Sequence, residues 1–191
     1  MLTELLKQKQ RYIFNLLDFD NNGFIERDDF VGIAENLCMV RGEELDSEES
    51  QHVLEQCNRL WDGLEFYIDA NHDDKCTFEE WLQFVDLKLV NDNSGESKDY
   101  LNSVVGRLFD LYDINGDGHI SVDEYIDIFL SFRLEAGLVA KSFQLLDLNG
   151  DGVITREELV KAVNEFLLSN DMDAPGNWIF GNWAAETSVA S

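Results

Sequence analysis

The chain has 191 residues, of which 39 are acidic and 14 are basic, and its formal net charge is −25. A surface this acidic argues against nucleic acid and anionic membranes as partners, because their phosphate groups would be repelled. No apolar run approaches the length of a membrane-spanning helix, and the first residues lack the pattern of a secretion signal. The three cysteines form no C-x-x-C pair and fit a reducing compartment. We therefore expect a cytoplasmic protein without a membrane span, and we expect a monomer.

Apolar residues recur at helical spacing in eight segments, so the expected fold class is all-α. The expected helices cover, in chain order, about residues 3–17, 30–41, 46–68, 81–89, 101–112, 126–130, 139–146 and 159–167. The polar stretch 91–97 is turn-forming and is expected to link two halves. The expected units are therefore residues 1–91, residues 99–168 and a C-terminal tail at 169–191.

Successive helices are joined two by two through twelve-residue loops that share one pattern of oxygen-bearing side chains. The loops are residues 18–29, 69–80, 113–124 and 147–158. In the third loop Asp113, Asn115 and Asp117 stand at places one, three and five, and Glu124 stands at place twelve. A hard cation such as Ca²⁺ takes about six to eight oxygens, which alternate residues of a tight loop can aim at one point. Ser121 and Glu124 also form a capping box, which puts the glutamate in the first turn of the next helix.

The expected ligands are the side chains at places one, three, five and twelve, together with the backbone carbonyl at place seven. In chain order these residues are Asp18, Asp20, Asn22, Phe24, Asp29, Asp69, Asn71, Asp73, Lys75, Glu80, Asp113, Asn115, Asp117, His119, Glu124, Asp147, Asn149, Asp151, Val153 and Glu158. We expect up to four Ca²⁺ ions to be bound, one in each loop.

Two loops depart from the pattern. Asp29 closes the first loop where the other loops have glutamate, and it is one methylene shorter. A smaller shell favours Mg²⁺, which takes octahedral geometry near about 2.0–2.1 Å, so Mg²⁺ is expected at the first loop. The second loop has Asp74 where the others have glycine, and Cys76 at the apolar eighth place. Asp74 must adopt a left-handed conformation or distort the loop, at a cost of about 1 kcal/mol, so occupancy of this loop stays open.

Paired loops are expected to meet through their eighth residues in a short antiparallel contact. Ile25 would face Cys76 in the first pair, and Ile120 would face Ile154 in the second. The second contact is the better one, because β-branched residues suit a strand.

The tail is unusual because it carries large apolar side chains in a segment that has no apolar partner of its own. Pro175 and Gly176 end any helix before it. Trp178, Ile179 and Phe180 follow, and tails that stay in water rarely carry so many apolar side chains. We expect this segment to fold back over the cleft beside the last helix.

These features resemble the sarcoplasmic calcium-binding proteins and calexcitins, a family of four-EF-hand proteins. The resemblance rests on the four loops, on Trp61-Asp62-Gly63-Leu64 before the second loop, on the run 9–30 and on Gly-Asn-Trp-Ile-Phe-Gly at 176–181. It implies a compact, cytosolic, all-helical Ca²⁺ and Mg²⁺ buffer whose C-terminal segment packs against the body. The region 155–180 also resembles a related branch of luciferin-binding proteins and photoproteins, which bind coelenterazine.

Three functions follow, of which a Ca²⁺ buffer without catalysis is favoured. The first alternative is a coelenterazine-binding protein or photoprotein, a class that uses His, Trp and Tyr side chains around an internal cavity. Two of the three histidines, His72 and His119, fall inside loops, so only His52 remains for such a role. The second alternative is a Ca²⁺ sensor, but sensors expose adaptable Met-rich grooves and this chain has three methionines. The sequence identifies no protein target.

Overall fold

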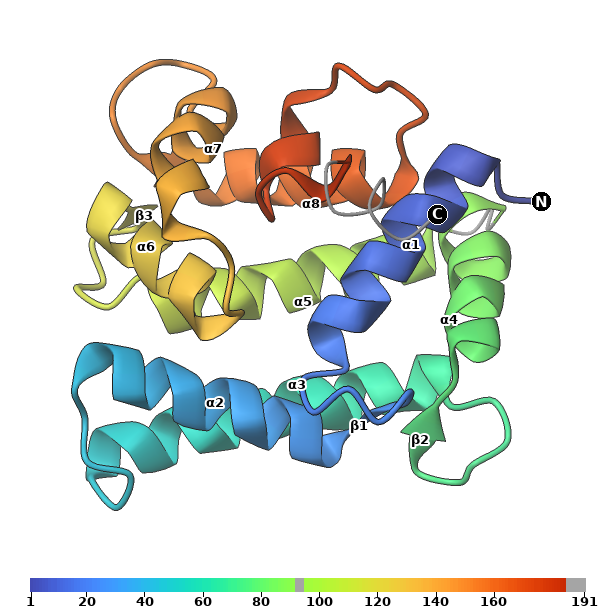
Figure 1. Cartoon of the computed structure of the whole chain (residues 1–191), viewed down its shortest axis with the longest axis horizontal. Coiled ribbons are helices and arrows are strands. Elements are labelled where there is room, and N and C mark those ends of the chain that lie inside the picture. The colour runs from blue at the N-terminus through green and yellow to red at the C-terminus, as the bar shows by residue number, and fades with distance from the viewer. Residues whose placement is uncertain (92–94, 185–191) are drawn as a thin grey trace.

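The computed structural model describes residues 1–91 and 95–184, and within them it contains eight α-helices and four two-residue strands (Figure 1). The helices are α1 (Glu4–Leu17), α2 (Arg27–Arg41), α3 (Glu48–Ile68), α4 (Phe78–Phe84), α5 (Glu96–Tyr112), α6 (Val122–Ser131), α7 (Val139–Leu146) and α8 (Arg156–Leu168). The strands are β1 (Ile25–Glu26), β2 (Lys75–Cys76), β3 (His119–Ile120) and β4 (Ile154–Thr155). The predicted all-α class with four helix–loop–helix units is confirmed. No helix in the described part is long and apolar enough to cross a membrane.

Capping boxes start the four helices that leave the loops. The side chains of Thr77, Ser121 and Thr155 each accept a hydrogen bond from the amide three residues later, where the closing glutamate stands. At α2 the box is formed by Glu26 and Asp29. Because each box includes place twelve of a loop, the same residues that begin the helix also close the loop.

Short antiparallel ladders join the loops in pairs, as predicted. Strand β1 pairs with β2 so that Ile25 faces Cys76, and β3 pairs with β4 so that Ile120 faces Ile154. All four of these side chains are fully buried. Each pair of loops is therefore joined by a buried contact between its two eighth residues.

Several element boundaries differ from the expected ones, because the helices that leave the loops begin within the loops' last residues and because of three further local features. Helix α3 begins at Glu48 because Ser47, rather than Asp46, accepts the capping bond from the amide of Ser50. After α4 the chain continues as a π-helical turn, η1 (Val85–Val90). Helix α5 begins at Glu96, inside the expected linker, because left-handed Gly95 ends the turn there. Linker residues 92–94 and tail residues 185–191 lie outside the described residues.

The tail packs on the body, as predicted. Two short 3₁₀ helices occur, η2 (Ala136–Leu138) before α7 and η3 (Pro175–Trp178) in the tail. Beyond η3, Ile179 and Trp183 are buried against the core. The ring of Phe180 stands edge-on to that of Phe166 on α8, with centroids 5.4 Å apart. Gly176 lies so close to α8 that a Cβ there would come within 2.3 Å of the Ala162 carbonyl oxygen. In Figure 1 the tail runs along α8, between α7 and α1.

Two side chains of α1 form hydrogen bonds with the end of α8. The side-chain amide of Gln10 donates to the Leu167 carbonyl at 2.8 Å, and the ammonium of Lys9 donates to the Ser169 carbonyl at 2.9 Å. These carbonyls belong to the last turn of α8 and the residue after it, where a helix leaves acceptors unsatisfied. Burial lowers the pKa of Lys9 to about 8, against the opposing charges of Asp171 and Glu165. The N-terminal helix therefore supports the C-terminal segment.

Candidate metal centres

The first aspartate of each loop is held by the backbone of its own loop. In the third loop Asp113 accepts hydrogen bonds from the amides of Asp117 and Gly118, at 3.1 and 2.9 Å. The corresponding bonds to Asp18, Asp69 and Asp147 recur in the other loops at 2.7–3.3 Å. Bonds from several amides fix both oxygens of a carboxylate, so the loop presents this ligand in one orientation.

The closing residue bridges the two ends of the loop in loops one, three and four. Glu124 accepts from the amides of Ile114 and Asn115 through Oε1, at 3.0 and 3.4 Å, and from the Ser121 amide through Oε2 at 2.8 Å. Burial would raise the pKa of Glu124, but the bonds from Ser121 and the loop amides outweigh it and lower this pKa. Glu158 makes the equivalent bonds to Leu148, Asn149 and Thr155. These hydrogen bonds therefore fix the orientation of both closing carboxylates within their loops.

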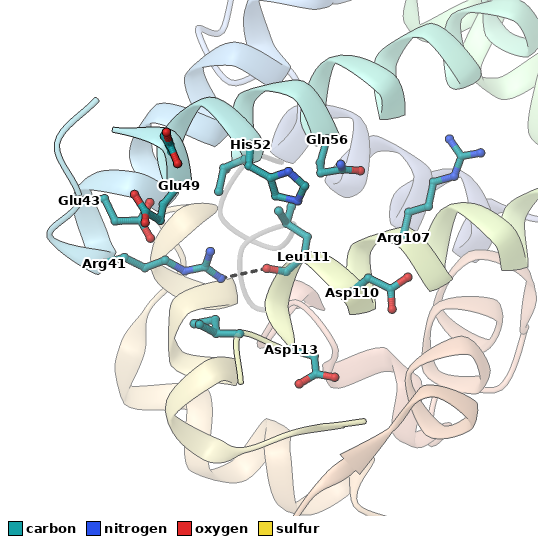
Figure 2. A pocket seen from close by; sticks show the side chains of 12 residues that line it. Arg41, Glu43, Glu49, His52, Gln56, Arg107, Asp110, Leu111 and Asp113 are labelled. Atoms are coloured by element: carbon teal, nitrogen blue, oxygen red, sulfur yellow. Dashed lines mark hydrogen bonds between the residues drawn. The ribbon is translucent and has the colours of Figure 1, made fainter. Parts of the chain in front are cut away.

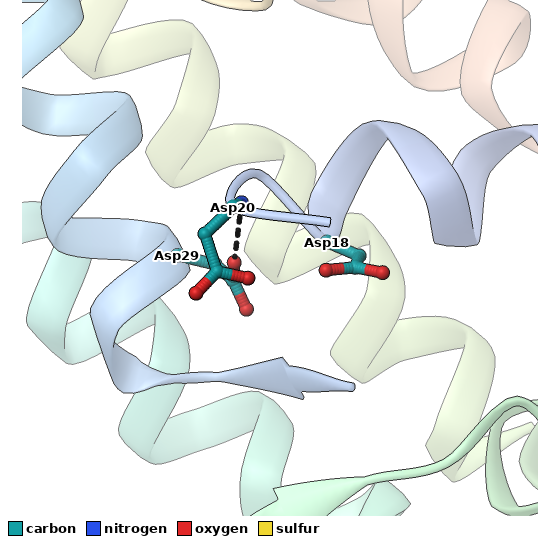
Figure 3. A group of neighbouring side chains, drawn as sticks. All are labelled: Asp18, Asp20 and Asp29. Carbon is teal, nitrogen blue, oxygen red and sulfur yellow. Dashed lines mark hydrogen bonds between the residues drawn. The ribbon is translucent and has the colours of Figure 1, made fainter. Parts of the chain in front are cut away.

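Loop one gathers three aspartates at one point. One carboxylate oxygen from each of Asp18, Asp20 and Asp29 lies within 4.8 Å of the other two, and Figure 3 shows them converging from the loop and the first turn of α2. Asp29 is 1 % exposed and accepts from the amides of Phe19, Asp20 and Glu26 at 2.8–3.2 Å. Burial raises the pKa of Asp29 to about 6 in spite of these bonds. A cation beside it would offset that cost of desolvation.

In each loop the side chain at place five accepts a hydrogen bond from the backbone amide at place seven. The amides of Phe24, Lys75, His119 and Val153 donate to the side chains two residues before them, at 2.9–3.2 Å. The side chains at place three receive the amide of place five in loops one, three and four, at 2.8–2.9 Å. The predicted ligand side chains of these three loops are thus all held within their own loops.

Two places in every loop adopt left-handed backbone, and only one was predicted. At place six φ is 93° for Gly23, 64° for Asp74, 83° for Gly118 and 88° for Gly152, so the expected strain at Asp74 is present. Place four is also left-handed, and it is occupied by Asn21, His72, Gly116 and Gly150. Glycine and asparagine accept this conformation most readily, so their presence at place four of loops one, three and four is a sequence signal for it.

Loop two is arranged differently from the other three. The carboxylates of Asp69 and Asp74 gather with Glu65 from the last turn of α3, with one oxygen of each within 4.8 Å of the others. Burial and the hydrogen bond with Asp74 raise the pKa of Glu65. Glu80 binds the amide and hydroxyl of Thr77, but among the described residues it makes no bond to the start of its loop. Asp74 and Glu65 are thus acidic neighbours that the sequence pattern did not include.

Loops one and two are also joined by an ion pair. The ammonium of Lys75 lies 2.7 Å from a carboxylate oxygen of Glu26, and the Lys75 side chain is 43 % exposed. The hydrogen bond with Glu26 raises the pKa of Lys75. Glu26 and Lys75 are register partners in the β1–β2 ladder, so the predicted pairing of Ile25 with Cys76 already implied this contact.

The donor set of the loops fits a hard divalent cation. The side chains that converge are carboxylates and amides, and no cysteine or histidine side chain is among them at the ligand places. Oxygen-only sets suit Ca²⁺ and Mg²⁺, whereas zinc and copper favour nitrogen and sulfur. The three cysteines are buried, and burial raises the pKa of the Cys57 thiol to about 12. The arrangement can therefore hold cations, and it presents no activated nucleophile at these places.

A polar cleft of about 580 Å³ lies beside loop three, between the α2–α3 turn and the end of α5 (Figure 2). His52 and Glu49 line it from α3, and Arg107 and Asp110 line it from α5. Asp113, the first ligand place of loop three, borders it. The Arg41 guanidinium, which also lines the cleft, donates to the Leu111 carbonyl at 3.0 Å. This hydrogen bond from α2 to α5 joins the N-terminal and C-terminal halves at the cleft.

An apolar cavity of about 150 Å³ lies inside the body and is lined from both halves. Its walls include Ile13, Trp81 and Tyr125, and the tail residues Ile179 and Phe180 complete them. The Tyr125 hydroxyl is engaged by the Ile179 carbonyl at 2.9 Å. No histidine is among the described residues that line this cavity. Its volume lies below the range of about 300–1,000 Å³ that holds larger ligands, so a larger occupant would require side-chain movement.

Comparisons with known proteins agree with this geometry. The family model described as EF hand matches residues 105–130 and 138–163, and the one described as EF-hand domain pair matches residues 1–37. These ranges contain loops one, three and four, whereas loop two lies outside them. The sarcoplasmic calcium-binding protein of Scylla paramamosain is 31 % identical over 121 residues, which are 63 % of this chain and 61 % of that protein. The alignment thus spans about three fifths of the curated relative.

Solved structures share the whole fold. A sarcoplasmic calcium-binding protein from amphioxus has a TM-score of 0.73 at 22 % identity, and the match covers 95 % of this chain and 99 % of that one. The coelenterazine-binding protein of Renilla muelleri has a TM-score of 0.77 at 23 % identity, with 94 % and 99 % covered. The predicted resemblance to sarcoplasmic calcium-binding proteins is confirmed, and the chain has the EF-hand fold.

Proposed function

We propose that this chain, which has the EF-hand fold and resembles sarcoplasmic calcium-binding proteins, is a cytosolic Ca²⁺ and Mg²⁺ buffer. The observation that carries the proposal is the bridging carboxylate at place twelve. Asp29, Glu124 and Glu158 each bind the backbone at both ends of their loop, so the ligands are assembled before a cation arrives. Up to four ions would be held, with loop two as the weakest site because Glu80 lacks this bridge. No catalysis is proposed.

The buffer is favoured over the sensor because the apolar surface is covered. Sensors expose an apolar groove when their loops are filled. Here Ile179 is 3 % and Trp183 is 4 % exposed, and the hydroxyls of Tyr12 and Tyr125 bind the carbonyls of Phe180 and Ile179. A surface held in this way is not free for a target helix. A buffer also requires no protein partner, and the chain would act as a monomer.

Calorimetric titration with Ca²⁺, with and without millimolar Mg²⁺, tests this function by counting the sites and sorting them. We expect Mg²⁺ to compete most strongly at loop one, because the shorter Asp29 favours the smaller ion. The variant Asp29→Glu should raise Ca²⁺ affinity at loop one about tenfold and weaken the competition by Mg²⁺. The exposed neighbour Asp28 stands outside the ligand pattern, so Asp28→Glu is the matched control. Equal competition by Mg²⁺ in the native chain and in Asp29→Glu would contradict the assignment.

The second candidate function is carriage of coelenterazine, or of a similar apolar heterocycle. The internal cavity favours it, because its walls are apolar and aromatic and the tail completes them. The likeness to the coelenterazine-binding protein supports only the common fold. Light emission is not favoured, since no described histidine lines the cavity.

A fluorescence titration with coelenterazine separates the carrier from the buffer. Trp81 lines the cavity, so a ligand there should quench tryptophan emission saturably. Filling the cavity with Ile13→Trp should abolish such binding, whereas Ile114→Trp at a position that is 56 % exposed should not. For a pure buffer we expect no saturable quenching in the native chain. Saturable binding that Ile13→Trp removes would instead establish the carrier.

A further inference from the structure

Phe19, at the second place of loop one, is held by both halves of the chain. Its ring is 9 % exposed and lies against Gly32 of α2, where a Cβ would come within 2.8 Å of the ring. The guanidinium of Arg133 lies 3.6 Å from the centre of the same ring. Arg133 Nη1 also donates to the Phe19 carbonyl at 3.2 Å. A residue 114 positions later in the chain thus contacts loop one through both a ring and a backbone atom.

The backbone of Phe19 is hydrogen-bonded to a ligand of loop one. Its amide donates to Asp29 Oδ1 at 2.8 Å, and the next amide, that of Asp20, donates to the same oxygen at 3.2 Å. A shift of Phe19 would therefore move the closing carboxylate and its two neighbouring ligands, Asp18 and Asp20. Among the described residues Arg133 makes no hydrogen bond or ion pair to a ligand side chain of loop one, so its influence on the site passes through Phe19.

Arg133 occupies a left-handed backbone position, where glycine is the residue that conformation favours. Arg133 has φ 57°, in the left-handed region that favours glycine, directly after the end of α6. The amides of Arg133 and Leu134 bind the carbonyls of Leu130 and Phe129, at 3.0 and 2.8 Å, so the turn is a regular helix end. Glycine would suit the position better in conformation, but it would provide neither the stacking contact nor the hydrogen bond to Phe19.

Helix α6 connects this contact to loop three. It carries Glu124, the closing residue of loop three, in its first turn, and Arg133 follows its last. Helix α2 carries Asp29, and the side-chain amide of its Asn36 donates to the carbonyls of Leu130 and Ser131 at 2.9 Å each. The two helices that leave loops one and three are thus joined side by side. Filling an EF-hand loop tends to reorient the helix that follows it.

We propose that Arg133 is a positioning residue for the cation site of loop one, and that it links this site to loop three across the two halves. The proposal rests on the proposed function, since it requires loops one and three to bind cations. With Phe19 held, the carboxylates of loop one stay converged. Occupancy of loop three, which acts on α6, then changes the affinity of loop one, and the reverse effect must be equal in free energy.

The test uses the full chain and reads the loops separately by NMR during Ca²⁺ titration. The amides of Gly23, Gly118 and Gly152 report loops one, three and four. Arg133→Gly keeps the left-handed backbone and removes the guanidinium, so the variant should fold. We expect its loop-one affinity to fall roughly threefold to tenfold, the size of one cation–π contact and one hydrogen bond. Loop four should be unchanged, which a general loss of structure would not produce.

A second variant separates position from charge. Arg133→Lys keeps the positive charge and the backbone, but an ammonium cannot lie flat on the ring as a guanidinium does. We expect it to weaken loop one about as much as Arg133→Gly. If charge alone mattered, Arg133→Gly would tighten loop one by removing repulsion and Arg133→Lys would change nothing. That result, or unchanged loop-one affinity in both variants, would overturn the positioning role.

The link to loop three is measured by a double-mutant cycle. Glu124→Gln should weaken loop one in the native background and should add no further weakening in Arg133→Gly. Equal weakening of loop one by Glu124→Gln in both backgrounds, or none in either, would refute the link. A Gly23 amide that responds to neither Ca²⁺ nor Mg²⁺ in the native chain would overturn the proposed function at loop one, and the positioning role with it. A native response without any effect of Arg133 would overturn the positioning role alone.

Discussion

Deleting residues 174–191 is expected to convert this protein into one that exposes apolar surface and aggregates. The described part of that segment buries Ile179 and Trp183, and burial of each large side chain contributes about 1.5–3 kcal/mol. Loss of both corresponds to about 3–6 kcal/mol of unfolding free energy, or roughly 10–20 °C in melting temperature for a chain of this size. Binding of a hydrophobic dye should rise strongly in the truncated protein, whether Ca²⁺ is present or absent.

Point variants make the experiment independent of a failure to fold. Ile179→Ala leaves the tail in place and should lower the stability by about 2–5 kcal/mol, because a buried side chain is truncated. Met172 precedes the tail contacts and is 56 % exposed, so Met172→Ala is the control and should have almost no effect. If the intact protein already binds dye strongly with Ca²⁺ and not without it, the tail does not keep the surface covered. The sensor would then replace the buffer.

Removing divalent cations with a chelator is expected to lower the melting temperature by roughly 10–20 °C. Each site filled to about 100 times its dissociation constant adds roughly 2.7 kcal/mol to the stability, so two filled sites suffice for this shift. Repulsion adds to the effect, because Asp18, Asp20 and Asp29 present oxygens within 4.8 Å of one another. Differential scanning calorimetry in Ca²⁺ and in chelator, at equal ionic strength, measures the difference.

Variants at neighbouring acids assign the shift to the loops. Glu124→Gln removes the closing charge of loop three and should reduce the difference between Ca²⁺ and chelator by about 2–3 kcal/mol. Glu157 lies beside the closing residue of loop four but outside the ligand pattern, so Glu157→Gln should leave the difference unchanged. A melting temperature that is indifferent to chelator would count against cation binding at all four loops.

The cation loops could be predicted from the sequence because their chemistry is local. All ligands of one loop lie within twelve residues, and the capping box that begins the next helix uses the same closing residue as the loop. The contact of Ile25 with Cys76 and of Ile120 with Ile154 followed from the same pattern, since paired loops meet at place eight. The assignment of individual ligand residues remains a prediction that the proposed titrations test.

Only the tertiary structure decided how distant segments modify these loops. Glu65 precedes loop two by a single helical turn, yet its approach to Asp74 depends on the left-handed backbone that Asp74 adopts. Lys9 is fully buried because the end of α8 offers it a carbonyl, although a lysine on an amphipathic helix would be expected at the surface.

The contact of Arg133 with Phe19 is the clearest case of such a decision. It joins residues that are 114 positions apart, and neither belongs to the ligand pattern. Side-chain spacing along the chain encodes the faces of single helices, but it does not encode which helix end meets which loop. That choice depends on how α2 and α6 pack, and on the small Gly32 that leaves space for the ring. The sequence by itself determined the four loops and their pairing, and packing between the halves decided that Arg133 contacts loop one through Phe19.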